Sequence, residues 1–191
     1  MNHSNMYFNE VSYIVENIDR NKIDDLAKAL SSVEGRVFVI GVGGSAGNAS
    51  HMVNDLRKLC NIEAYAPTDN ISELTARTND EGFETVFVEY LKGSRFCYKD
   101  ALFVLSVGGG NEEKNVSVNL INAIKYANQK TAQVFGIVGK SDGYAANYGD
   151  IVVVVPVACD ERITPHSEAF QSVVWHCLVS HPILQKQKTK W

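Results

Sequence analysis

The stretch that decides the fold is Val37-Phe38-Val39-Ile40-Gly41-Val42-Gly43-Gly44-Ser45, residues 37–45. Its first four residues are apolar and mostly β-branched, which is typical of a strand buried on both faces of a sheet. A glycine turn follows, and residues from about 45 to 59 have the apolar spacing of a helix. The same order returns in the strand pattern of 101–105, which a second glycine run at 106–111 follows. Strands that alternate with helices in this way predict a parallel sheet between two layers of helices.

Further elements extend this pattern along the whole chain. Apolar runs at 64–66, 134–138 and 151–155 complete a predicted sheet of five strands. Helices are predicted over about 5–32 and 116–127, with a last helix to about 180. Thr164 is the expected cap of that last helix, Pro165 its first position and His181-Pro182 its end.

The predicted fold class is therefore α/β, a three-layer αβα arrangement around a five-stranded parallel sheet. We expect one domain over 1–191. Its parts are an N-terminal helical segment (1–33), an αβα core (34–183) and a polar tail (184–191).

Charge and composition exclude several classes of protein. Lysine and arginine total 18 against 22 acidic residues, a net charge of −4. A mildly acidic chain without a basic stripe is a poor candidate for nucleic-acid binding. No apolar run approaches the roughly 20 residues that span a bilayer, and no signal-peptide pattern opens the chain. The cysteines are widely spaced, as in a cytoplasmic protein with reduced thiols; they are Cys60, Cys97, Cys159 and Cys177.

Both glycine runs point to an anionic ligand. In an open α/β sheet, ligands bind beyond the carboxyl ends of the strands, where glycines and helix N-termini accommodate phosphate. Tight strand–helix turns would explain one such loop, but two loops with adjacent Ser45 and Ser106 favour an anion site. No Walker lysine follows either loop. Asp69, some 24 residues after Ser45, leaves dinucleotide binding as a weak alternative, and we expect no nucleotide cofactor.

Four motifs carry a family resemblance. In chain order they are GVGGSAGNASH (41–51), TARTNDEGFE (75–84), DALFVLSVGGGN (100–111) and TPHSEAFQSVVWH (164–176). As a set they resemble the sugar isomerase (SIS) domain family, in its phosphoheptose isomerase branch. The resemblance implies a flavodoxin-like sheet and a homotetramer with active sites between subunits. It also implies conversion of sedoheptulose 7-phosphate to D-glycero-D-manno-heptose 7-phosphate, the first step toward nucleotide-activated heptose.

Candidate catalytic residues lie on two of the predicted helices. His51 and Asp55 are four apart, a spacing that suits an ordinary surface pair as well as two metal ligands. His176 suits a core histidine, and Glu168 suits the positive start of its helix. The resemblance instead makes all four ligands of Zn²⁺ or another divalent metal. It also gives Asp55, His176 and Glu168 catalytic roles, with Asp55 where the family has glutamate and Glu168 where it has glutamine.

The spacing of Glu168 and His176 sets a geometric condition on that metal site. Eight residues of helix rise about 12 Å, whereas two ligands of one metal lie a few Å apart. Either the regular helix begins after Glu168, or the side chains bend together, or the site is shared between chains, or the two residues belong to different sites.

The resemblance also assigns substrate contacts. Val107, Gly108 and Asn111 stand where the family has hydroxyl residues, and His166 stands where it has arginine. The altered residues Asp55, Glu168 and Val107 keep a second interpretation open, a non-catalytic protein that binds or senses a sugar phosphate. The expected substrate-binding residues are Gly43, Gly44, Ser45, Asn79, Asp80, Ser106, Gly108, Gly109, Gly110 and Asn111.

Overall fold

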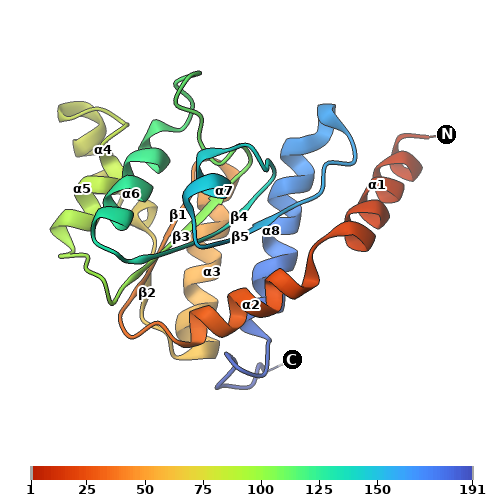
Figure 1. Cartoon of the computed structure of the whole chain (residues 1–191), viewed down its shortest axis with the longest axis horizontal. Helices are drawn as coiled ribbons and strands as arrows, with labels where there is room; N and C mark the ends of the chain where they lie inside the picture. Colours follow the sequence, from red (N-terminus) through yellow and green to blue (C-terminus); the bar gives the residue numbers. More distant parts are fainter. Residues whose placement is uncertain (1, 191) are drawn as a thin grey trace.

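A parallel sheet of five strands forms the centre of the molecule (Figure 1). The computed structural model describes residues 2–190; Met1 and Trp191, the two ends of the predicted domain, lie outside the described residues. The strand order is β2-β1-β3-β4-β5, and every neighbouring pair is parallel. This confirms the predicted sheet. The strands are β1 (Val37–Ile40), β2 (Ala64–Tyr65), β3 (Ala101–Ser106), β4 (Gln133–Val138) and β5 (Ile151–Val154).

Helices cover both faces of this sheet, so the three-layer prediction is also confirmed (Figure 1). In β1, Val37 and Val39 pack into one apolar cluster while Phe38 and Ile40 pack into the other, as the alternation of strand side chains requires. The first layer holds α1 (His3–Asn17), α2 (Arg20–Ser31), α3 (Gly44–Cys60) and α8 (Ile163–Val179). The second holds α4 (Ile71–Asp80), α5 (Val86–Gly93), α6 (Val118–Gln129) and α7 (Tyr144–Tyr148).

The single helix predicted over 5–32 is wrong, because the chain breaks it in two. Ile18 is extended, with ψ 138°, and ends α1. Asp19 then caps α2, because its side chain accepts a hydrogen bond from the Lys22 backbone N–H. This local cap satisfies an N–H group that a helix start leaves unpaired. As a result α1 extends away from the sheet, while α2 packs on it (Figure 1).

Two predicted helix starts are also corrected. The last helix begins at Ile163 after a short 3₁₀ turn, Asp160–Arg162, so Thr164 is not its cap. Pro165 remains within the first turn, where no N–H partner is needed. The helix predicted from Val116 begins at Val118, because Val116 pairs with Asn111 in a small hairpin. The sequence analysis did not predict α4, α5 or α7, nor the 3₁₀ turn Pro67–Asp69.

The strand order places the two glycine loops next to each other. In a sheet of this order the direction of winding reverses between β1 and β3, and ligands bind at the carboxyl ends of the strands there. The two loops follow these two strands. Gly43, Gly109 and Gly110 have φ values of 64°, 70° and 90°, a region that side chains with a Cβ rarely adopt. None of the helices within residues 2–190 has the length and apolar run that crossing a membrane takes.

Candidate functional site

Helices α3 and α8 are joined by a polar network next to the first glycine loop. The amide of Asn48 donates to the Glu168 carbonyl at 2.9 Å and to the Gln171 side-chain oxygen at 3.0 Å. In return, Ser172 Oγ donates to Asn48 Oδ1 at 2.7 Å. One side chain of α3 therefore makes three hydrogen bonds to α8. These bonds fix how the facing surfaces of the two helices lie against each other.

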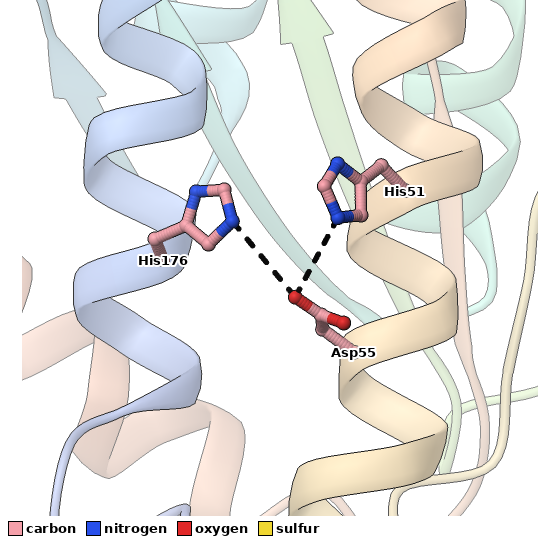
Figure 2. A group of neighbouring side chains, drawn as sticks. All are labelled: His51, Asp55 and His176. Atoms are coloured by element: carbon pink, nitrogen blue, oxygen red, sulfur yellow. Dashed lines mark ion pairs between the residues drawn. The ribbon is translucent and has the colours of Figure 1, made fainter. Parts of the chain in front are cut away.

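Further along the same two helices, three potential ligands converge. His51 and Asp55 project from α3 and His176 projects from α8, as Figure 2 shows. Asp55 Oδ2 lies 3.9 Å from Nε2 of each histidine, and the three ligand atoms lie within 4.8 Å of one another. The Asp55 side chain is 14% exposed, whereas both imidazoles are about half exposed. The group is open to solvent on the histidine side.

Hydrogen bonds with neighbouring groups orient this cluster for binding a cation. His176 Nδ1 lies 2.7 Å from the Ser172 carbonyl, which only accepts, so Nδ1 carries the hydrogen. The lone pair of the neutral ring is then on Nε2, the atom that faces Asp55. Asn54 donates to the other oxygen of Asp55 at 2.8 Å. Two acceptors that face each other favour a cation between them.

The donor set fits a divalent metal. Two imidazole nitrogens and a carboxylate oxygen are common zinc ligands, each at about 2.0–2.2 Å from the ion. Two ligand atoms of one ion therefore lie at most about 4.4 Å apart. The two 3.9 Å separations around Asp55 fall within that limit. His51, Asp55 and His176 are thus the residues of this structure that could hold the metal.

Glu168 lies elsewhere. Helix α8 is regular through both Glu168 and His176, so the helix rise separates their positions by about 12 Å. The Glu168 carboxylate lies against Gly44, where an added Cβ would stand 2.5 Å from it. It therefore occupies the start of α3, whose helix dipole favours negative charge. The structure places this carboxylate beside the glycine loop and apart from the three clustered ligand atoms.

The predicted substrate residues are only partly available to a ligand. Ser45 and Ser106 are buried, and Ser106 Oγ accepts a hydrogen bond from the Gly109 N–H at 3.0 Å. Asn111 belongs to the small hairpin, and its side chain accepts from the Lys114 N–H at 2.8 Å. Ser106 and Asn111 therefore shape the second loop through bonds within the chain, and burial keeps Ser45 from solvent.

The remaining predicted polar residues make contacts of their own outside the ligand cluster. Asn79 and Asp80 are exposed at the end of α4, and the Asn79 amide donates to Asp80. His166 is buried and points to α1, with Nε2 2.7 Å from a carboxylate oxygen of Glu10. Arg162 donates to the same carboxylate. His166 therefore connects α8 to α1 and does not face the glycine loops.

A pocket beside the first glycine loop brings in residues that the sequence analysis missed. Its volume is about 530 Å³. Ser117 and Asn119 enter it from the start of α6, and the buried Asn119 amide nitrogen has no partner within residues 2–190. The sequence analysis missed Ser117 and Asn119 because it placed 116–119 inside a helix. A serine and an asparagine at the end of the loop that follows a glycine run would have been the signal for polar groups beside a ligand. The pocket is lined by Val42, Phe83, Glu84, Asn115, Ser117, Val118 and Asn119.

Comparisons with known proteins give a consistent result. The family model described as "SIS domain" matches residues 6–139. A phosphoheptose isomerase from Syntrophotalea carbinolica is 30% identical over 186 residues, covering 89% of this chain and 87% of that protein. The lincomycin biosynthesis protein LmbN of Streptomyces lincolnensis is 33% identical over 155 residues, covering 77% of this chain and 56% of its own length. The solved structure of a phosphoheptose isomerase from Francisella tularensis is 26% identical, with a TM-score of 0.81, and the match covers 96% of this chain and 98% of that one.

Proposed function

This chain belongs to the SIS domain family, and we propose that it is a phosphosugar isomerase that interconverts a ketose phosphate and an aldose phosphate. The substrate we propose is sedoheptulose 7-phosphate, and the product is D-glycero-D-manno-heptose 7-phosphate, a precursor of nucleotide-activated heptose. The observation that carries the proposal is the convergence of His51, Asp55 and His176 between α3 and α8. Relatives named phosphoheptose isomerase support the choice of substrate.

The reaction moves a proton between adjacent carbons. A base removes a proton from C1 of the ketose, an enediol forms, and a proton returns at C2 while C1 becomes the aldehyde. The negative charge that develops on the oxygens needs stabilisation. Backbone N–H groups of the two glycine loops and of the α6 start suit the phosphate at the other end of the sugar. Binding there would position C1 and C2 near the catalytic side chains.

We assign Zn²⁺ or another divalent metal to His51, Asp55 and His176, because their donor atoms fit such an ion. When bound, the metal would polarise the substrate carbonyl. The Ser172 carbonyl keeps the hydrogen of His176 on Nδ1, so that Nε2 remains a ligand. Asn54 holds the Asp55 carboxylate in place.

Two carboxylates are candidates for the base. Glu168 lies at the glycine loop, where the sugar chain would pass, and Asp55 lies in the ligand cluster. We favour Asp55, because it lies beside the residues that would hold the metal at the substrate carbonyl, whereas Glu168 lies about 12 Å away along α8. Both ring nitrogens of His176 are engaged, Nδ1 with the Ser172 carbonyl and Nε2 with the metal, so its proposed role is to hold the metal at the substrate oxygens. We further propose a homotetramer with active sites between subunits, and a cytoplasmic location.

An NMR time course with purified protein and sedoheptulose 7-phosphate tests the proposal. We expect signals of an aldoheptose 7-phosphate to appear, and we expect His176→Asn to remove turnover while the fold survives. Glu168→Gln and Asp55→Asn separate the two candidate bases. Glu34→Gln is the matched control, since Glu34 is an exposed carboxylate before β1, away from the loops. Sugar-phosphate binding without turnover would contradict the isomerase and favour a sensor.

A further inference from the structure

Beneath the two half-exposed histidines lies a fully buried tryptophan. Trp175 is 0% exposed and belongs to the apolar cluster between α3, α8 and the sheet. Its ring is stacked on His176, with centroids 3.6 Å apart and an interplanar angle of 28°. The same ring meets His51 edge to face, at 4.6 Å and 69°. One indole therefore contacts both imidazoles, which themselves lie 5.3 Å apart.

These contacts supply an orientation that burial does not. The His51 side chain is 57% exposed and that of His176 is 51% exposed, so protein atoms do not pack against the solvent-facing side of either ring. His176 is also held at Nδ1 by the Ser172 carbonyl. His51 is held by the indole, and its Nε2 lies 3.9 Å from Asp55 Oδ2. The direction in which His51 Nε2 points therefore depends largely on Trp175.

Packing alone does not explain why an indole occupies this position. Its Nε1–H is buried and has no hydrogen-bond partner within residues 2–190. A buried donor without a partner costs free energy that a phenyl or aliphatic side chain would avoid. The larger ring, however, reaches both histidines. Its π face also carries negative potential, which favours the positive charge that an imidazole gains when it ligates a metal.

We propose that Trp175 is a positioning residue, which holds the imidazoles of His51 and His176 so that their Nε2 atoms converge with Asp55 on a divalent cation. This inference rests on the metal site of the proposed function and adds the indole that supports its ligands. It follows that loss of the indole weakens metal binding more than the loss of packing explains. It also follows that Trp175 fluorescence reports the bound metal directly.

The first test measures Zn²⁺ affinity by competition with a chelating dye. Residues that support metal ligands from behind typically change affinity about tenfold to a hundredfold when mutated, and we expect a loss in this range for Trp175→Leu. Trp175→Phe keeps a ring and should recover part of the affinity. Phe170→Leu is the matched control, because Phe170 is a buried aromatic residue on α8 in the same cluster. It should lower stability while leaving the affinity close to that of the wild type.

The second test uses fluorescence, which a purely structural role would not affect. The sequence contains two tryptophans, so Trp191→Phe leaves Trp175 as the only indole. Titration with Co²⁺, which quenches fluorescence, should remove most of the Trp175 emission. The quenching should saturate at one Co²⁺ ion per protein chain. His51→Ala and His176→Ala should each abolish the saturable quenching.

Several outcomes would overturn the inference. Equal losses of Zn²⁺ affinity in Trp175→Leu and Phe170→Leu would show that Trp175 contributes only packing. Unchanged affinity in Trp175→Leu, or Co²⁺ binding without quenching, would show that the indole does not support the ligands. A wild-type protein that binds neither ion would also refute it. Because none of these readouts measures turnover, the isomerase assay can succeed or fail independently.

Discussion

Asp100→Ala should destabilise the protein well beyond a surface mutation. Asp100 is 3% exposed and lies directly before β3. Its carboxylate accepts four hydrogen bonds: from the Arg36 backbone N–H at 2.8 Å, from Arg36 Nε at 3.1 Å and Nη2 at 2.9 Å, and from the Cys97 N–H at 3.0 Å. These bonds join the residue before β1 to the residue before β3. The two strands that carry the glycine loops are thus tied together at their starts.

The size of the effect follows from these contacts. Breaking a buried ion pair by removing one partner costs about 3–5 kcal/mol. The Arg36 side chain is 27% exposed and keeps the Ser94 carbonyl as a partner at 3.0 Å, so the lower end of the range applies. A loss of about 3 kcal/mol in a chain of this size lowers Tm by about 6–12 °C.

Acid should reduce the difference between Asp100→Ala and the wild type. Burial raises the pKa of the Asp100 carboxyl, but hydrogen bonds from Arg36 and Cys97 outweigh burial and leave the pKa below its usual value. Stability from a carboxylate with a lowered pKa is present above its usual pKa and is lost as the pH falls through the folded-state pKa. The gap between the two proteins should therefore narrow at low pH.

Thermal and urea unfolding, followed by circular dichroism at one protein concentration, measure these effects. Lys99→Ala is the control, because Lys99 and its partner Glu34 are 51% and 72% exposed, and such pairs contribute at most about 1 kcal/mol. A loss below about 1 kcal/mol in Asp100→Ala, or a gap that does not depend on pH, would refute the reasoning.

The remaining predictions concern titratable groups outside the ligand cluster. Hydrogen bonds from Arg162 and His166 lower the pKa of Glu10 to about 2. The free energy of unfolding of the wild type should therefore exceed that of Glu10→Gln by less and less as the pH falls from about 4.5 toward 2. A difference between the two proteins that stays constant over this pH range would contradict this. Iodoacetamide at pH 8, followed by peptide mass spectrometry, should label exposed Cys177 and spare Cys60, because burial and then the charge of Asp55 raise the Cys60 pKa to about 11. Labelling of native Cys60 as fast as in denaturant would contradict its burial.

The sequence predicted the sheet well because local signals determine it. Apolar β-branched runs such as 37–40, bounded by glycines, have few alternatives to a buried strand. The break at Ile18-Asp19 was missed because apolar spacing continues across it, although the Asp19 cap decides the backbone there. The helix predicted from Val116 was misplaced because Val116 pairs with Asn111, a contact between loop residues that periodicity does not encode.

The candidate site was predictable only where its residues share one helix. The spacing of His51 and Asp55 placed them on one face of α3, where the structure has them. The approach of His176 from α8 depends on how two distant helices pack, which spacing does not determine. Helix rise raised the question of whether Glu168 could reach the other ligands, but the packing of Glu168 on Gly44 needed the structure. The contact of Trp175 with both imidazoles is likewise tertiary.

Isomerisation of sedoheptulose 7-phosphate in D₂O, followed by ¹H and ²H NMR, tests the central claim most directly. Proton transfer through an enediol lets the abstracted proton exchange with solvent before it returns. The account predicts an aldoheptose 7-phosphate that carries deuterium at C2. A product with only hydrogen at C2 would contradict the proton-transfer mechanism, and absence of product from fully metal-loaded protein would contradict the isomerase itself.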